Sequence, residues 1–146
     1  MPDSGKAQEY LQVQVRTASP DQLLLMLLDG AVRFVEGALD RMERGDAEGK
    51  NDLLLKAQKI ILELIQSLNP AIGEKIYANL VGLYKFIYQR LVDGNLGNDR
   101  ARLEEGLEIL GVVRETWRQA VTIYRSTAAG TTTEETATPA GISLQA

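Results

Sequence analysis

The chain of 146 residues contains neither cysteine nor histidine. Without cysteine it can form no disulfide and no thiolate metal site. Histidine is the commonest general base in enzymes and a common metal ligand, so its absence excludes Ser-His and Cys-His nucleophiles and the Glu-x-x-His pairs of di-iron bundles. We therefore expect no cofactor, no metal site and no enzymatic activity. An enzyme built on carboxylates alone would need a pair of buried carboxyl groups with raised pKa values.

A net positive charge and long apolar runs are also lacking. The net charge is −4 and the pI is about 4.9, which argues against a nucleic-acid partner and against docking on an anionic membrane. The longest apolar run, Leu23 to Leu28, has six residues, whereas a transmembrane helix needs about 20. No apolar run follows a basic cluster near residue 1, so we expect no secretory signal and a cytoplasmic location.

Helical periodicity is present in four segments, at about residues 20–44, 46–68, 70–93 and 99–125. The first begins with the capping-box pattern Ser19-Pro20 followed by Gln22, and Gly45 ends it. The third opens at Asn69-Pro70 and stops at the turn signal 93–95. In each segment the apolar residues recur every three or four positions and form one stripe. The stripes are Leu24, Leu27, Leu28, Ala31, Phe34, Val35, Ala38, Leu39 and Met42; Leu54, Ala57, Ile61, Leu64 and Leu68; Ile72, Ile76, Leu80, Leu83 and Ile87; and Leu103, Leu107, Leu110, Val113, Trp117, Ala120 and Tyr124.

Short links between long helices force neighbouring helices to be antiparallel. The sequence therefore predicts an all-α fold, an antiparallel up-down-up-down four-helix bundle over residues 19–125. Residues 1–18 are expected to be a short N-terminal cap segment, either a short helix or an extended strap. Residues 126–146, rich in Thr, Ala and Gly, are expected to be a disordered tail.

Two groups of apolar residues exceed what one stripe per helix needs. The run Leu23–Leu28 covers every face of a helix, so that end is either buried under residues 1–18 or forms a groove for a partner, with Leu24 and Leu28 as contacts. Both hold if the N-terminal segment covers the groove and moves aside. A second stripe on the third helix is either a contact surface or a widened edge of the core. Its members are Tyr77, Val81, Tyr84 and Tyr88.

Glycines and the single tryptophan add to this picture. Each glycine inside a helix costs about 1 kcal/mol relative to alanine, so several of them indicate close approach of another backbone. That approach is either interhelix packing or a flat docking site, and the sequence leaves both open. Trp117 lies on the stripe of the fourth helix, where core packing is expected. The helical glycines are Gly30, Gly37, Gly82, Gly106 and Gly111.

The order of several short motifs resembles the flagellar secretion chaperone family FliS over about residues 6–125. The segment 17–23, with Leu25-Met26-Leu27 and Asp29-Gly30-Ala31, resembles the family's first-helix signature. Further matches follow in the family's order: Lys56-Ala57-Gln58, Ile60-Ile61, Ser67-Leu68-Asn69, Asn79-Leu80, Leu83-Tyr84, Asn95, Asn98-Asp99 and Arg114-Glu115-Thr116-Trp117. Two positions depart from it. Leu28 replaces an aromatic residue, which changes the expected groove, and Gly94 replaces an alanine, which is expected to end the third helix early.

The resemblance implies a cytosolic export chaperone that binds the C-terminal region of flagellin, prevents premature polymerisation and hands the subunit to the flagellar type III export apparatus. It also implies that the client wraps around the bundle in apolar grooves and displaces the N-terminal cap. Tyr10 matches the family's N-terminal tyrosine, so Tyr10 and its neighbour Leu11 join the expected contacts. The export gate would be a second partner. The alternative is a helical adaptor or self-assembly module, in which the same surface forms a homodimer. For the chaperone, a weak homodimer is expected when no client is bound.

Overall fold

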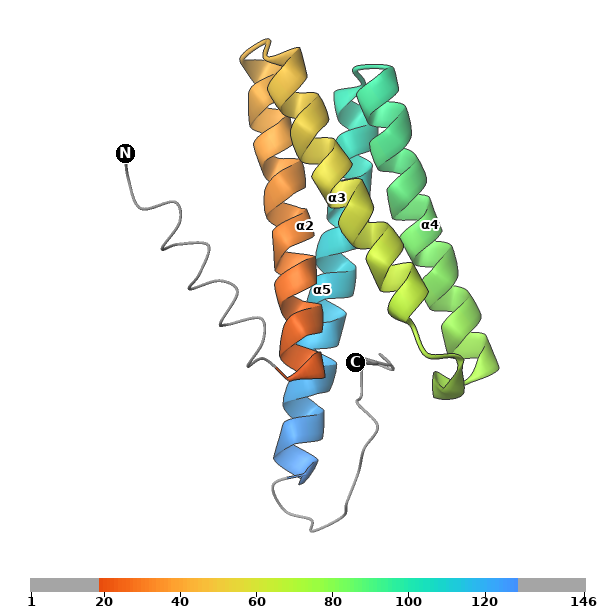
Figure 1. Cartoon of the computed structure of the whole chain (residues 1–146). Helices are drawn as coiled ribbons and strands as arrows, with labels where there is room; N and C mark the ends of the chain where they lie inside the picture. The colour runs from red at the N-terminus through yellow and green to blue at the C-terminus, as the bar shows by residue number, and fades with distance from the viewer. Residues whose placement is uncertain (1–18, 129–146) are drawn as a thin grey trace.

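The computed structural model describes residues 19–128, which form four long helices packed side by side (Figure 1). Helix α2 spans Pro20–Glu43, α3 Ala47–Ser67, α4 Glu74–Leu96 and α5 Arg100–Ala128, and a 3-10 turn, η1, spans Pro70–Ile72. Helices α2 and α4 each lie between α3 and α5. The predicted all-α, antiparallel four-helix bundle is confirmed. Residues 1–18 and 129–146, and with them Tyr10, Leu11 and the predicted cap, lie outside the described part.

Polar caps set the helix boundaries as the sequence predicts. The Ser19 hydroxyl accepts a hydrogen bond from the backbone N–H of Gln22 at 3.2 Å, and the Gln22 side chain accepts one from the backbone N–H of Ser19 at 2.9 Å. Gly45, with φ 74°, turns the chain after α2. The Asp46 carboxylate then accepts from the N–H of Gly49 at 2.9 Å, which caps the start of α3.

The boundaries of the third predicted helix are wrong at both ends. The chain makes only the turn η1 after Asn69, because Gly73 has φ 119°, a region that favours glycine, and α4 begins at Glu74. At the other end α4 continues through Gly94 to Leu96. Gly94 does not end the helix but allows close packing there, since a Cβ at this position would lie 2.5 Å from Leu103 Cδ2. The last helix, α5, ends at Ala128, three residues after the predicted end at residue 125.

The turn between α4 and α5 is fixed from α3. Lys50 is buried, and its ammonium donates to the Asn95 carbonyl at 3.2 Å and to the Asn98 side-chain oxygen at 2.9 Å. Asn98 has φ 48°, a left-handed conformation that asparagine tolerates. Asn51 also accepts a hydrogen bond from the Asn95 amide at 2.8 Å. These contacts hold α4 and α5 together at their loop end.

The core confirms three of the four predicted stripes and corrects the stripe of α4. Ile76 and Leu83, expected inside, are 55% and 41% exposed. The predicted Ile87 is buried, but it is joined in the core by Tyr84 and Leu91, so α4 is rotated about its axis relative to the prediction. The core consists of Leu24, Leu28, Ala31, Val32, Val35, Ala38, Leu39, Leu54, Ala57, Ile61, Leu64, Leu68, Tyr84, Ile87, Leu91, Leu103, Leu110, Val113 and Trp117.

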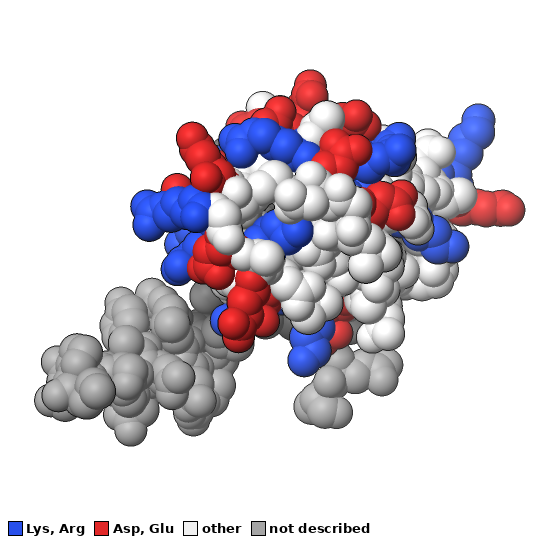
Figure 2. All heavy atoms as spheres, turned by 90° about the horizontal axis from the view of Figure 1, so that it is seen from above, with Lys and Arg blue, Asp and Glu red and all other residues white. Residues whose placement is uncertain are grey.

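Charges of both signs are mixed over the face seen from above (Figure 2). Ion pairs such as Arg41 with Asp46 at 3.1 Å and Arg44 with Asp40 at 3.2 Å are exposed, so each contributes at most about 1 kcal/mol to stability. No helix among residues 19–128 is long and apolar enough to cross a bilayer.

Candidate functional site

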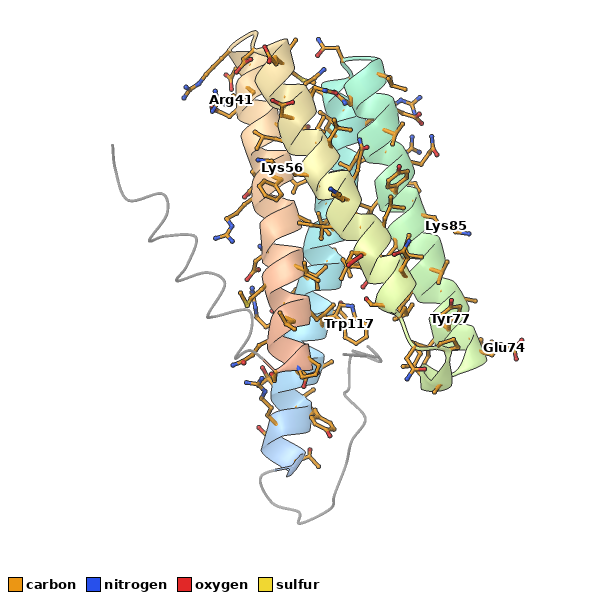
Figure 3. All side chains as sticks on the ribbon, viewed as in Figure 1. Arg41, Lys56, Glu74, Tyr77, Lys85 and Trp117 are labelled. Atoms are coloured by element: carbon orange, nitrogen blue, oxygen red, sulfur yellow. The ribbon has the colours of Figure 1, made fainter. Side chains whose placement is uncertain are left out.

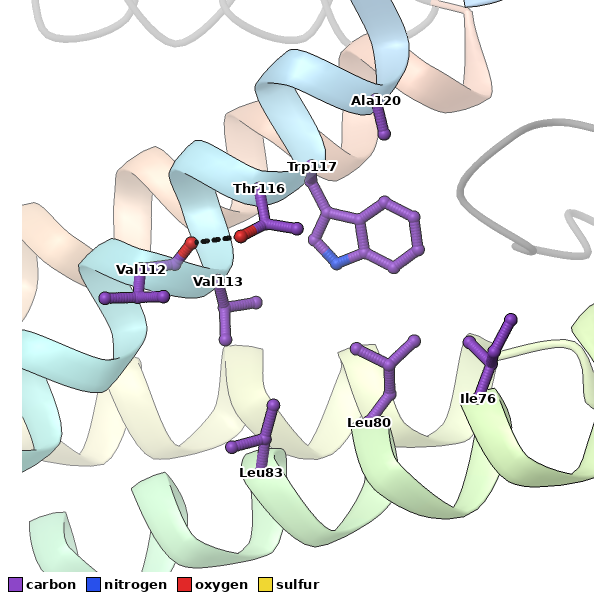
Figure 4. Close-up of a pocket in the computed structure, with 8 residues that line it drawn as sticks. All are labelled: Ile76, Leu80, Leu83, Val112, Val113, Thr116, Trp117 and Ala120. Carbon is purple, nitrogen blue, oxygen red and sulfur yellow. Dashed lines mark hydrogen bonds between the residues drawn. The ribbon is translucent and has the colours of Figure 1, made fainter.

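An apolar groove of about 260 Å³ lies between α4 and α5 (Figure 4). The side chains of the two helices face each other across it, with Trp117 directed from α5 toward α4. Three lining residues come from α4 and five from α5. They are Ile76, Leu80 and Leu83, and Val112, Val113, Thr116, Trp117 and Ala120.

The groove has an exposed rim and a buried floor. On the rim, Ile76 is 55% exposed, Leu83 41% and Val112 59%. On the floor, Val113 is buried and Trp117 is 8% exposed. A large contiguous patch of exposed apolar surface is unusual on a soluble protein and is typical of a site where another molecule binds.

The groove is almost free of polar atoms. Thr116 is its one polar lining residue, and the Thr116 hydroxyl donates to the backbone carbonyl of Val112 at 2.8 Å. That hydroxyl is therefore satisfied within α5. The groove can offer shape and apolar contact, and it suits aliphatic or aromatic side chains better than charged ones.

A buried hydrogen bond fixes the floor. The indole Nε1–H of Trp117 donates to the hydroxyl of Tyr84 at 3.0 Å. Burial raises the pKa of Tyr84 to about 12, and the hydrogen bond from Trp117 opposes that rise. Tyr84 is thus a neutral acceptor at physiological pH. It anchors the indole, which points into the space between α5 and α4 (Figure 3).

Glycines allow close approach at one end of this helix pair, and the groove lies at the other end. Near the loop, a Cβ on Gly106 would lie 3.2 Å from Arg90 Cβ and 3.3 Å from Leu91 Cδ2, so the missing side chain lets α4 and α5 approach closely. Toward the start of α4 the two helices diverge (Figure 1), with Trp117 between them. The groove is the space this divergence leaves.

The structure supports the packing interpretation for Gly37 and leaves the docking interpretation of Gly82 and Gly111 a prediction. A Cβ on Gly37 would meet Leu53 Cδ1 at 3.1 Å, so this glycine serves packing of α2 on α3. Gly82 and Gly111 have no atom within 4 Å of such a Cβ. They face open space and do not serve packing within the described bundle.

None of the predicted contact residues within the described part of the chain lines the groove. Leu24, Leu28 and Tyr84 are buried in the core. The remaining predicted contacts within the described residues, Tyr77, Val81 and Tyr88, are partly buried and pack against the core. Tyr84 is therefore part of the core, one of the two interpretations above, and whether the others touch a partner stays a prediction.

Sequence reasoning missed the rim of the groove. Ile76, Leu83 and Val112 were either assigned to the core or not singled out. The available signal was the second apolar stripe on α4, because a helix with two stripes has more apolar surface than one core contact can bury. That signal predicts a spare apolar face without telling which of the two faces is spare.

A second, more polar depression lies between α2 and α3, with a volume of about 320 Å³. Leu27 and Ile60 form its apolar part, and Lys56, Lys59 and Glu63 surround them. The Lys56 ammonium also lies 5.7 Å from the centre of the Phe34 ring. Leu27 is thus one member of the Leu23–Leu28 run that lines a surface depression.

One carboxyl group among the described residues is buried with a raised pKa. Burial raises the pKa of Asp21 above its ordinary 3.8, while the positive charge of Arg125 opposes the rise. A single such group does not form the carboxylate pair that an acid–base enzyme needs. Within residues 19–128 no cluster of three Asp or Glu side chains could hold a metal ion.

Comparison with known proteins shows which family the sequence matches. The family model described as "Flagellar protein FliS" matches residues 3–124. The flagellar secretion chaperone FliS of Bacillus subtilis (strain 168) is 39% identical over 112 residues, which cover 77% of this chain and 83% of that protein. The Salmonella typhimurium protein of the same name is 37% identical, covering 77% of this chain and 84% of its own. The Vibrio cholerae protein is 32% identical, covering 84% and 93%.

Proposed function

The chain belongs to the FliS family of flagellar proteins, and on that premise we propose that it is a cytoplasmic export chaperone for the C-terminal segment of flagellin. The relatives reported above are named flagellar secretion chaperones. The family is one of chaperones, which confirms the expectation that the chain is not an enzyme. The proposal adds the client and the place where it binds.

The observation that carries this proposal is the open groove between α4 and α5. Its rim residues Ile76, Leu83 and Val112 are each about half exposed, and its lining offers no free charge. An amphipathic helix laid into such a groove would bury its own apolar face and the rim together. A client end that exposes apolar residues and assembles with its own kind fits this chemistry.

Binding of this kind blocks assembly by covering the surface that assembly uses. A segment that folds on binding spends about 2–5 kcal/mol of the interaction energy on ordering. The complex is therefore specific yet reversible, as a chaperone that releases its client at the flagellar type III export gate requires. No bond is made or broken, and one chaperone protects one client.

The contacts predicted from the sequence remain part of the proposal. Tyr77, Val81 and Tyr88, which are partly exposed, would extend the client's path along α4. The N-terminal segment with Tyr10 and Leu11 would be displaced as the client binds. Leu24, Leu28 and Tyr84 are buried, so a client could reach these three only if the bundle loosened.

Titration calorimetry with a peptide from the flagellin C-terminus tests the proposal. We expect a one-to-one complex with the parent chain. Burying a whole Ile or Val side chain contributes about 1.5–3 kcal/mol, and Ile76 and Val112 still expose 55% and 59%. Half of that contribution is about 0.8–1.5 kcal/mol, so Ile76→Ser and Val112→Ser should each weaken binding roughly four- to twelvefold.

Leu55→Ser on α3 is the matched control, because Leu55 is 51% exposed and does not line the groove. It should bind the peptide like the parent. Equal losses in the control and in the groove variants would place the client elsewhere. Absence of binding by the parent at high micromolar peptide, together with a tight dimer in light scattering, would favour the self-assembly module instead.

A further inference from the structure

We propose that the segment following α5 folds back and places Ile142 and Leu144 in the groove between α4 and α5. The chain would then carry a tethered competitor for its own docking site. The effect on client binding rests on the proposed function, whereas the docking itself does not.

The sequence after α5 matches the chemistry of the groove. Ile142 and Leu144 are the only large apolar residues among the 18 that follow Ala128. Residues 136–146 carry no charged side chain, and the acidic pair Glu134-Glu135 lies upstream of them. In an extended segment, positions 142 and 144 point to the same face and lie about 6.6 Å apart. A neutral segment with two aliphatic anchors suits a groove whose single polar group is already satisfied.

The chain is long enough to reach. The groove begins at Ala120, eight residues before the end of α5, and ends at Val112, sixteen residues before it. At ~1.5 Å per residue, these points lie about 12 and 24 Å from Ala128 along the helix. Ile142 is fourteen residues beyond Ala128 and can extend about 46 Å. Gly130 stands where a chain commonly reverses after a helix.

Because the tail is covalently attached to the bundle, two apolar side chains are enough to occupy the groove. A covalent link of this length gives the anchors an effective concentration in the millimolar range at the groove, so weak docking is enough to occupy it. A tail that fills the groove about nine-tenths of the time would lower the apparent client affinity about tenfold. A client with more anchors would still displace the tail.

Trp117 reports on the groove without any client, because it is the single tryptophan of the chain and lines the site. We compare acrylamide quenching of its fluorescence in the full chain, in the full-length variant Ile142→Ser with Leu144→Ser, and in a chain ending at residue 128. Quenching should rise, and the emission maximum should move to longer wavelength, in both altered chains. Thr131→Ser with Thr133→Ser, in the same tail, is the control and should match the parent.

Three results would overturn the inference. The first is quenching that is the same in all four chains. The second is an indole exposed by deleting residues 1–18 and not by altering the tail, which would make the N-terminal segment the occupant. The third is quenching that depends on protein concentration, which would point to a second copy.

The flagellin peptide separates this inference from the proposed function. We expect the tail variants to bind the peptide about tenfold more tightly than the parent. If no chain binds the peptide while the tail variants still show the increased quenching, the docking is supported and the proposed client is refuted. Unchanged quenching with normal peptide binding refutes the docking alone.

Discussion

Replacing Tyr84 with phenylalanine removes the acceptor that holds the floor of the groove. In Tyr84→Phe the Trp117 indole N–H loses its partner, which lies 3.0 Å away in the parent. Tyr84 is 1% exposed and Trp117 8%, so water cannot freely replace the lost bond. A buried donor without a partner costs about 1–3 kcal/mol. We expect the free energy of unfolding at pH 7 to fall by about that amount.

The same substitution has the opposite consequence in alkali. Burial raises the pKa of Tyr84 from 10.0 to about 12. Between these values a tyrosine in the unfolded chain ionises while Tyr84 in the folded chain keeps its proton, so the free energy of unfolding falls as the pH rises through this window. At ~1.36 kcal/mol per pKa unit, the parent loses about 3 kcal/mol from this group. Tyr84→Phe lacks that loss, so near pH 12 it should be as stable as the parent or more stable.

Urea unfolding followed by far-ultraviolet circular dichroism, in steps between pH 7 and 12, measures both effects. The quantity of interest is the difference between parent and variant, in which the contributions of other titrating groups cancel. Trp117→Phe serves as the control, because it keeps the Tyr84 hydroxyl and should keep the alkaline loss. If the free energies of unfolding of the parent and of Tyr84→Phe changed in parallel above pH 10, the inference that Tyr84 is enclosed beneath the groove would be refuted.

Four further substitutions test the bundle by thermal and urea unfolding. Gly94→Ala should lower the free energy of unfolding by about 1–3 kcal/mol, because its Cβ would lie 2.5 Å from Leu103 Cδ2. Gly82→Ala is the control: its Cβ would have no atom within 4 Å, so it should raise the free energy of unfolding by about 0.5–1 kcal/mol. Equal effects of the two substitutions would contradict the close approach of α4 and α5. Lys50→Met should cost about 1–3 kcal/mol by removing two hydrogen bonds from the α4–α5 turn, and an unchanged stability would show that the turn does not need them. Because the pKa of Asp21 is raised, the parent should lose stability as the pH rises from near 3.8 to the raised value, and Asp21→Asn should lack this part of the slope.

The sequence predicts those parts of the fold that depend on local interactions. The Ser19 capping box, the glycine after α2 and the stripes of α2, α3 and α5 are recoverable because each involves residues within a few positions of one another. The four helices and their antiparallel order follow from the same local signals. The described structure confirms this level of the prediction.

The rotation of α4 could not be predicted in the same way. Two apolar stripes, one containing Ile76 and Leu83 and the other Tyr77 and Tyr84, compete for the core, and both have helical spacing. The choice between them depends on Trp117 of α5, whose indole hydrogen bond reaches Tyr84 across 33 positions of sequence. The break at Gly73 is equally hidden, because Asn69-Pro70 is a good helix start and only the backbone conformation shows that the helix begins later.

The rotation of α4 also decides which of its apolar residues belong to the core and which belong to the proposed docking site. Tyr84 and Leu28 are explained by the fold alone, since they are enclosed by other helices. The fold alone does not explain Ile76 and Val112, because a serine at either half-exposed position would leave the core unchanged. Their contribution to stability is small and their contribution to binding should be large. Substitutions on the rim should therefore weaken client binding without lowering the melting temperature, whereas substitutions at core positions that do not line the groove, such as Leu28, should do the reverse.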